Sequence, residues 1–270
     1  MSNVPTLGFI GAGNMAEAII RGALAAGVVT PDQLVVSDPS ADRLAIFTEM
    51  GVTTTDSNLN LITRSDQIVL AVKPQIFPKL ASDLASIDPN RHILISIMAG
   101  ISTAKIAALT GHTNVRVVRV MPNTPLLVGK GMSGICTGDN AQPGDESLTL
   151  SVFAAAGKTV TITEPEMDAL TAVSGSGPAY LFFLAEAMTA AGEAMGLSPE
   201  ASDLLTRQTL LGASTLLSDS TETAQELRRR VTSPGGTTEA AINHMSDARL
   251  PDTVIAAMQR AAQRSRDLGA

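Results

Sequence analysis

A glycine-rich segment near the amino terminus has the residue types and spacing that can bind a dinucleotide. Residues 11–16 read GAGNMA, which fits the pattern G-x-G-x-x-A, and they follow the apolar run 7–10. In a strand–turn–helix context, Gly11 permits a tight turn, Gly13 lets the backbone approach a pyrophosphate, and Ala16 allows close packing. The helix N-terminus would offer free N–H groups to the phosphates. A tight turn without a ligand is the alternative, and the context favours dinucleotide binding.

The choice between NAD and NADP depends on the residues that follow the second apolar run, 33–37. An acidic residue there binds the ribose hydroxyls and repels a 2′-phosphate, so Asp38 favours NAD. Ser37, Ser40 and Arg43 could instead hold a 2′-phosphate if the Asp38 side chain points away. Both cofactors therefore stay open on these residues alone.

Three further loops follow expected strands. They read AVKPQ at 71–75, IMAG at 97–100 and VMPNTP at 120–125. Ligands bind at the carboxyl ends of parallel strands in open α/β sheets, so these loops are expected near the dinucleotide. In the last of them, two prolines hold the loop around Asn123 and Thr124. Ordinary turn chemistry is the alternative for all three.

Two segments of the second half contain more small and hydroxyl residues than a plain helix needs: SGSGPAY at 174–180 and VTSPGGTTE at 231–239. The second one precedes an expected helix at 237–245 and predicts an anion site for a carboxylate, with a helix cap in a tight loop as the alternative. No lysine follows Lys158, and His244 is the one histidine there. A ketone usually needs such a proton donor, whereas a protonated imine accepts hydride without one, so C=N is favoured over C=O.

The elements that position these residues change character near residue 164. Before it, β-branched runs alternate with helical spacing, which predicts a parallel sheet with helices on both faces. After it, only helical spacing is found, at 166–173, 178–195, 199–217, 222–230, 237–245 and 251–267. We therefore predict an α/β Rossmann-type domain over 1–163 and an all-helical substrate and dimerisation domain over 164–270. The helices at 178–195 and 199–217 are apolar around most of their surface, which favours packing against another subunit over a single-chain bundle.

Composition excludes several other classes of protein. The 270 residues carry a net charge of −7 with no basic stripe, which argues against a nucleic-acid partner. The sequence contains no run of 18 apolar residues and no signal-peptide pattern, so neither membrane nor secretion is expected and the cytoplasm is the default. One cysteine, Cys136, and three scattered histidines predict no metal site. Neither a serine nucleophile elbow nor a P-loop is found, which leaves hydride transfer from a nicotinamide as the natural chemistry.

Five segments, in their order and spacing, resemble those of pyrroline-5-carboxylate reductases. They are FIGAGNMA, AVKPQ, RVMPNTP, AVSGSGPAY and RRRVTSPGGTTEAAI, and the resemblance covers nearly the whole chain. It implies a Rossmann-type domain followed by a helical dimerisation domain, often assembled into rings such as decamers. It also implies reduction of 1-pyrroline-5-carboxylate to L-proline, the final step of proline biosynthesis, usually with NADPH. Asp38 stands where a neutral residue is common in that family, so NAD stays open beside NADP.

The resemblance also implies roles for particular residues. Those expected to line the cofactor are Ile10, Gly11, Ala12, Gly13, Asn14, Met15, Ser37, Asn58, Ala71, Val72, Lys73, Pro74, Met98, Ala99 and Gly100. Ser233, Gly236 and Thr237 are expected to bind the substrate carboxylate. Thr238 is expected to bind the ring nitrogen as well, orienting the imine, which makes it the catalytic residue.

Two other functions remain as alternatives. One is a related two-domain reductase that acts on another cyclic imine or on a β-hydroxy acid, although the latter should carry a lysine on an inter-domain helix. The other is a non-catalytic dinucleotide-sensing protein, which would keep Gly11 and Gly13 but would not need the loop at 231–239.

Overall fold

The computed structural model describes residues 6–269 and divides the chain into two compact units. The first unit contains the described residues up to Ser176 and also those from Ala261 to Gly269. The second unit is Gly177–Arg260. The chain therefore leaves the first unit once and returns to it.

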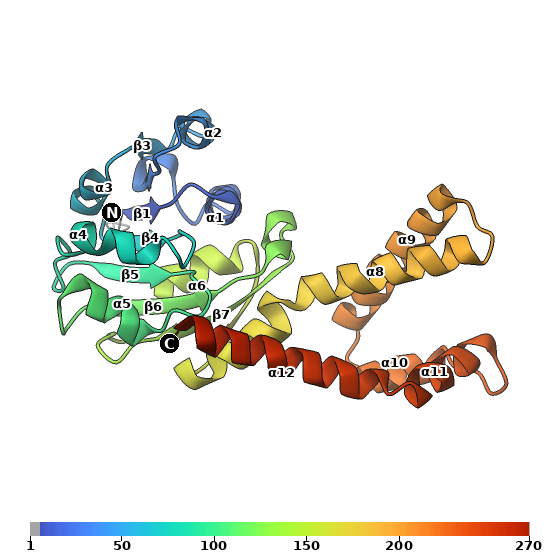
Figure 1. Cartoon of the computed structure of the whole chain (residues 1–270). Coiled ribbons are helices and arrows are strands. Elements are labelled where there is room, and N and C mark those ends of the chain that lie inside the picture. Colours follow the sequence, from blue (N-terminus) through green and yellow to red (C-terminus); the bar gives the residue numbers. More distant parts are fainter. Residues whose placement is uncertain (1–5, 270) are drawn as a thin grey trace. The chain divides into compact units, whose positions relative to one another are not determined.

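The first unit is built on one eight-stranded sheet in the order β3-β2-β1-β4-β5-β6-β7-β8 (Figure 1). The strands are β1 Leu7–Ile10, β2 Leu34–Ser37, β3 Thr53–Thr55, β4 Gln67–Leu70, β5 Ile93–Ser96, β6 Arg116–Met121, β7 Gly131–Thr137 and β8 Gly157–Thr161. Every residue of β1, β2, β4 and β5 is buried. Burial on both faces explains why these segments are apolar without alternation.

Strand direction changes once, after β6. Strands β1 to β6 are parallel to their neighbours, as predicted, but β7 is antiparallel to β6 and β8 is parallel to β7. Only residues 122–130, with the short turn η3 (Thr124–Val128), connect β6 to β7. A parallel connection needs a crossover of a dozen or more residues, so β7 returns in the opposite direction. The sheet therefore differs from the prediction in its last two strands.

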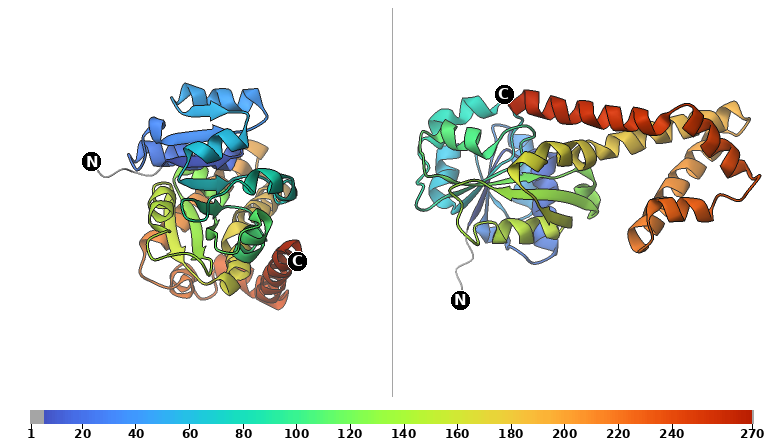
Figure 2. Two further views of the ribbon diagram at one scale, coloured as in Figure 1. Left: turned by 90° about the vertical axis from the view of Figure 1, so that its left-hand side faces the viewer. Right: turned by 90° about the horizontal axis from the view of Figure 1, so that it is seen from below.

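Helices cover both faces of this sheet (Figure 2). They are α1 Asn14–Ala25, α2 Ala41–Glu49, α3 Asn58–Arg64, α4 Ala81–Leu84, α5 Thr103–Thr110 and α6 Ser147–Ala154, with short turns η1 Pro31–Gln33 and η2 Phe77–Leu80. Phe9 of β1 belongs to the apolar cluster that contains residues of α1 and α6, whereas Ile10 belongs to the cluster with α3 and α5. Successive strand residues point to opposite faces, so both clusters are built on the same strands.

The second unit is entirely helical. It contains α8 Gly177–Ala194, α9 Pro199–Asp219, α10 Ala224–Arg230, α11 Thr237–Asp247 and the first part of α12 (Leu250–Gly269). Helices α8 and α9 approach closely at Gly192, where a Cβ would lie 2.7 Å from Ser202 Oγ. Many of their large apolar side chains are exposed within this chain, for example Phe183 at 74% and Leu204 at 67%.

The segment before α8 is not the plain helix that its spacing predicts. It consists of η4 Glu164–Glu166, α7 Met167–Leu170 and the π-turn η5 Thr171–Gly175, closed by a hydrogen bond of 2.8 Å from Ser176 N to Thr171 O. At this wider turn Gly175 packs against Met121 of β6. A Cβ there would lie 2.5 Å from Met121 Cε, so the contact leaves no room for a side chain. Short π segments inside helices are frequent at functional sites.

Among residues 6–269, no helix combines the length and the apolar character needed to cross a membrane. No group of metal-ligating side chains is found in the same part of the chain.

Candidate functional site

The glycine turn after β1 is held by the ends of the two neighbouring strands. Gly11 has a φ of +105°, and a Cβ there would lie 2.7 Å from Ala71 O. Its N–H donates to Ser37 O at 2.8 Å, and Ala71 N donates to Ile10 O at 2.8 Å. A residue with a side chain would be strained here, so glycine is required by the turn itself.

Gly13 has a different reason to be glycine. It is the N-cap of α1, its backbone is extended, and no side chain caps the helix. A Cβ at Gly13 would meet no protein atom within 4 Å, so it would project into open space. Helix α2, by contrast, is capped by the Ser40 hydroxyl and α5 by that of Ser102. An uncapped helix N-terminus with open access to its backbone fits the pyrophosphate of a dinucleotide.

Ser37 and Asn58, two of the predicted cofactor residues, are brought together at the end of β2. Ser37 Oγ donates to Asn58 Oδ1 at 2.7 Å, and Asn58 Nδ2 donates to Asp83 Oδ2 at 2.8 Å. Asp83, in α4, was not among the predicted site residues. Its position in the site depends on how α4 packs beside α3, which no local pattern in the sequence indicates.

The Asp38 carboxylate points into the glycine turn and not away from it. Its Oδ2 accepts from Ala12 N at 2.8 Å, and its Oδ1 accepts from Ser40 N at 2.9 Å. Arg43 lies at the same turn, since its Nε donates to Ala12 O at 2.6 Å and its Nη2 to Glu17 Oε2 at 2.9 Å. Ser37, Ser40 and Arg43 could hold a 2′-phosphate if the Asp38 side chain pointed away, and in the structure it points toward the turn.

The charge of Glu17 persists to low pH because two guanidinium groups bind it. Burial alone would raise the pKa of Glu17, but hydrogen bonds from Arg21 and Arg43 outweigh that effect and hold the pKa below its ordinary value. Glu17 therefore remains an anion at neutral pH, and the charge of Arg43 is compensated.

The loops after β4 and β5 carry the other predicted cofactor residues, 71–74 and 98–100, at the same edge of the sheet as the glycine turn. The β5 loop is backed by the end of α12, which the sequence did not indicate. Gly100 has a φ of +77°, and a Cβ there would lie 2.8 Å from Leu268 Cβ. Nearby, Ser265 Oγ of α12 donates to Asp168 Oδ1 at 2.6 Å.

Asn123, at the end of β6, anchors the π-turn. Its Nδ2 donates to Ser174 O at 3.2 Å and to Ser174 Oγ at 3.3 Å, while its Oδ1 accepts from Met132 N at 2.9 Å. The side chain is buried. The two prolines around Asn123 predicted a fixed loop conformation. The sequence did not predict that Asn123 would bond Ser174 in the SGSG segment.

The four predicted substrate residues lie together in the second unit, at the bend before α11. Gly236 is the N-cap of α11, without a side-chain cap. A Cβ on it would lie 2.5 Å from Ser233 Oγ, and its N–H donates to Ser233 O at 3.0 Å. Thr237 and Thr238 form the first turn, Thr237 exposed and Thr238 half-buried. This bend presents hydroxyl groups and a helix N-terminus, which suits a small carboxylate.

Glu239 holds the bend in shape. Its Oε2 accepts from Gly235 N at 2.7 Å, and Gly235 has a φ of +71°. A carboxylate at this position of a helix commonly reaches back to a backbone N–H before the helix. Glu239 was not predicted as a site residue, although its spacing from the bend was the available signal.

Cys136 lies beside an ion pair and is not one of the predicted site residues. Arg119 of β6 forms an ion pair with Glu164, and Cys136 Sγ lies 3.5 Å from Glu164 Oε2. Burial first, and then the charge of Glu164, raise the pKa of the Cys136 thiol to about 12. The thiol is therefore protonated and inert near neutral pH.

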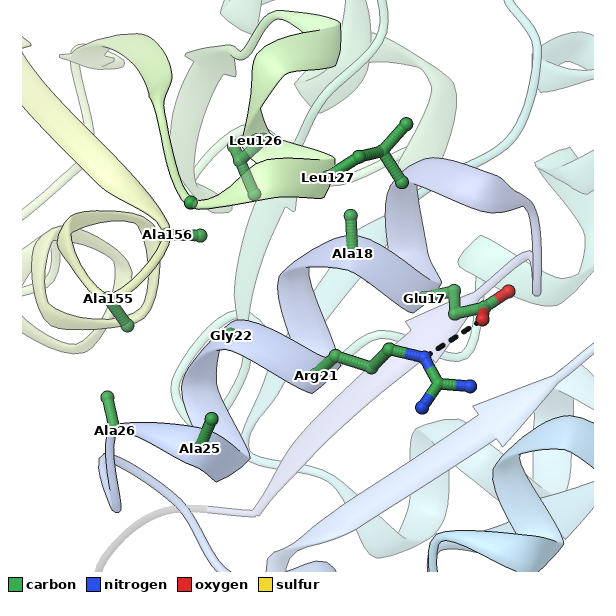
Figure 3. A pocket seen from close by; sticks show the side chains of 11 residues that line it. Glu17, Ala18, Arg21, Gly22, Ala25, Ala26, Leu126, Leu127, Ala155 and Ala156 are labelled. Carbon is green, nitrogen blue, oxygen red and sulfur yellow. Dashed lines mark hydrogen bonds and ion pairs between the residues drawn. The ribbon is translucent and has the colours of Figure 1, made fainter.

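A separate hollow of about 460 Å³ lies along the later turns of α1 (Figure 3). Its walls are mostly alanine and leucine, and the Arg21–Glu17 pair lies at one side of it. None of the predicted site residues lines this hollow. The candidate site is instead the row of loops around Gly13.

An open glycine turn on a Rossmann-type sheet, followed by an all-helical unit with an uncapped helix N-terminus at Gly236, is typical of a dinucleotide-dependent oxidoreductase of the two-domain type. Residues 164–268 match the family model described as pyrroline-5-carboxylate reductase dimerisation. Residues 6–100 match the model described as NADP oxidoreductase coenzyme F420-dependent. The helical match begins where the second domain was predicted to begin, while the compact units separate at Ser176, so the boundary at 163/164 stays a prediction.

Curated relatives match over their full length. The chain is 41% identical to the pyrroline-5-carboxylate reductase of Pseudomonas aeruginosa, covering 99% of both chains. It is 38% identical to that of Haemophilus influenzae, covering 97% of both chains. The chain belongs to the pyrroline-5-carboxylate reductase family.

Solved structures agree with this assignment and with the predicted fold. The pyrroline-5-carboxylate reductase of Coxiella burnetii has a TM-score of 0.89 and 35% identity, covering 99% of this chain and 100% of that one. The pyrroline carboxylate reductase of Plasmodium falciparum, solved with NADP bound, has a TM-score of 0.86 and 33% identity, with complete coverage of both chains.

Proposed function

We infer that this chain reduces 1-pyrroline-5-carboxylate to L-proline with NADPH. Family membership points to this reaction, and one observation carries it to this chain: the uncapped turn at Gly13, where a Cβ would project into open space. When NADPH is bound with its pyrophosphate at this turn, its reduced nicotinamide would supply the hydride.

We propose that the cofactor is held by the loops at the carboxyl ends of four strands. The backbone of residues 10–15 binds the pyrophosphate through N–H groups at the start of α1. Ser37 and Asn58 face the adenosine ribose. The loops 71–74 and 98–100 line the remaining length of the dinucleotide. This assignment is supported by the adjacency of β2, β1, β4 and β5 in the sheet.

The substrate is held by the bend before α11. Ser233, Gly236 and Thr237 bind its carboxylate, because backbone N–H groups and hydroxyls at an uncapped helix N-terminus favour an anion. The Thr238 hydroxyl bonds the ring nitrogen and orients the C=N bond. The imine arrives protonated, so its carbon accepts hydride while the nitrogen keeps its proton, and no side chain has to act as a strong acid.

We propose that the protein is a homodimer through its helical domain, and that dimers assemble into a larger ring such as a decamer. The exposed apolar side chains of α8 and α9 support a contact with a second copy, because monomers rarely expose contiguous apolar surface. A cytoplasmic location suits the free, buried Cys136. The net charge of −7 supports small-molecule over nucleic-acid partners.

The direct test is to follow the oxidation of NADPH and NADH with 1-pyrroline-5-carboxylate and to identify L-proline as the product. The variant Thr238→Ala should keep its thermal unfolding temperature while kcat falls by about 10- to 100-fold, because an oriented hydrogen bond to the reacting group is lost. Thr238→Ser, which keeps the hydroxyl, should retain most of the activity. No turnover with either cofactor would contradict the proposed function, and unchanged kinetics in Thr238→Ala would contradict the role of Thr238.

A further inference from the structure

The adenosine-ribose end of the proposed cofactor site carries an unusual number of carboxylates for a site that receives a phosphate. Asp38 bonds to the backbone N–H of Ala12, and Asp83 accepts from the amide of Asn58. Asp38 follows β2 directly, at the position where an acidic residue meets the ribose hydroxyls in dinucleotide-binding folds. Both side chains are half-buried, so solvent screens them only in part.

The chain of hydrogen bonds that links Ser37, Asn58 and Asp83 has a defined donor-to-acceptor direction. A carboxylate only accepts hydrogen bonds, so the NH₂ group of Asn58 must face Asp83 and its carbonyl oxygen must face Ser37. Ser37 then donates its single hydroxyl proton to Asn58, and its oxygen is left with lone pairs only. A ribose hydroxyl can donate to such an oxygen, whereas a phosphate oxygen cannot.

The cation at this end of the site is compensated. Arg43 directs its Nε to Ala12 O and its Nη2 to Glu17, and Glu17 is ionised. Arg21 also bonds Glu17. The carboxylates of Glu17, Asp38 and Asp83 and the guanidinium groups of Arg21 and Arg43 are bound by hydrogen bonds around the glycine turn and the end of β2, and their formal charges sum to −1.

We propose that Asp38 and Asp83 set the dinucleotide preference of this chain by weakening the binding of the 2′-phosphate, so that NADH binds about as tightly as NADPH. The proposal rests on the proposed function, since it concerns the same site. Asp38 acts through its charge and by holding the glycine turn. Asp83 is a positioning residue that acts through Asn58 and Ser37.

The test is calorimetric titration of the full-length protein with NADPH and with NADH, in the absence of substrate. In the wild type, the two Kd values should lie within about tenfold of each other. NADH lacks the contacts that the 2′-phosphate of NADPH makes, but it also lacks the repulsion between that phosphate and the carboxylates, so the two differences offset. Asp38→Asn removes the charge and keeps one acceptor, for Ala12 N, while Ser40 N loses its partner. It should tighten NADPH relative to NADH by about tenfold.

Two substitutions at Asp83 separate charge from hydrogen-bond direction. Asp83→Asn removes the charge and keeps an acceptor for Asn58. Asp83→Ala also lets the Asn58 amide turn over and frees the Ser37 hydroxyl to donate. NADPH should therefore bind more tightly in Asp83→Ala than in Asp83→Asn, and equal binding would contradict the directional step. Asp32→Asn, an exposed position in the turn η1 before β2, is the matched control and should bind both cofactors as the wild type does.

The same titrations decide the proposal. A ratio of the two Kd values that is unchanged in folded Asp38→Asn and Asp83→Ala would overturn it, as would a wild type that binds NADPH more than about a hundredfold tighter than NADH. The ratio of KM values for the two cofactors should follow the Kd ratio. Binding constants that follow the expectation, with no turnover of 1-pyrroline-5-carboxylate, would support this inference and contradict the proposed function.

Discussion

At the scale of single residues, the two glycines of the turn after β1 are glycine for different physical reasons. Gly11 is needed by the backbone, because its φ is positive and its Cβ position is blocked by Ala71 O. Gly13 is not needed by the protein itself, because nothing lies near its Cβ position. Two glycines of one motif are thus expected to respond differently to substitution.

Gly13→Val should fold normally and lose dinucleotide binding, since the added side chain fills the space that the pyrophosphate requires. Gly11→Val should lower the free energy of unfolding by about 1–3 kcal/mol or more, because a β-branched residue is forced to a positive φ. Thermal unfolding combined with NADPH titration measures both effects. A Gly13→Val protein that binds NADPH with wild-type affinity would contradict the assignment of the turn.

Cys136 should be unreactive in the native protein. Its pKa is raised to about 12 by burial and by Glu164, so almost no thiolate exists at pH 8. A group whose folded pKa is raised stabilises the fold below its unfolded pKa, and this contribution is lost as the pH rises towards 12. Labelling by a thiol reagent at pH 8 should therefore appear only as urea unfolds the protein. Rapid labelling without urea would show that the thiol is not buried.

At the scale of elements, short turns decide which residues meet. The direct connection between β6 and β7 forces the sheet to reverse, and the π-turn η5 sets Gly175 against Met121. Asn123 joins these two features, because it bonds Ser174 on one side and Met132 on the other. The SGSG segment is therefore positioned by the end of β6 as well as by its own helix.

Asn123→Ala should lower the free energy of unfolding by about 1–3 kcal/mol, because the partly buried backbone groups Ser174 O and Met132 N lose their partner. Asn140→Ala is the matched control, since the Asn140 side chain donates to Thr113 O at an exposed position, and it should change stability by less than about 0.5 kcal/mol. Urea unfolding of the two variants measures the difference. Equal stabilities would contradict the anchoring role of Asn123.

At the scale of the whole molecule, each unit has a different kind of surface. The first unit has two apolar clusters of its own, one on each face of the sheet. In the second unit, only Gly192, Ser202 and Thr206 are buried among the residues of α8 and α9, while large apolar side chains are exposed. A helical unit of this kind needs a further surface to cover it.

Phe183→Glu should convert the oligomer into smaller species, because the Phe183 side chain is 74% exposed within this chain and a charge there would be buried in a subunit contact. Arg64→Glu, an exposed position on α3 of the first unit, is the control and should leave the assembly unchanged. Analytical ultracentrifugation measures the mass of both variants. An unchanged mass for Phe183→Glu would place the subunit contact elsewhere.

The sequence alone determined the features that are written locally along the chain. The glycine spacing after an apolar run marks the dinucleotide turn, because the steric demand of that turn falls on neighbouring residues. The change from β-branched runs to helical spacing near residue 164 marks the two kinds of structure for a similar reason, since each period reflects the geometry of one element. The Pro-Gly-Gly bend before α11 was also visible in this way.

Tertiary structure alone decided the features that join distant segments. The direction of the Asp38 carboxylate, the placing of Asp83 against Asn58 and the bond from Asn123 to Ser174 all depend on how separate elements pack. Packing is a property of the whole core, and no short pattern encodes which side chain of a later helix will face a given loop. For that reason the sequence left the choice between NAD and NADP open.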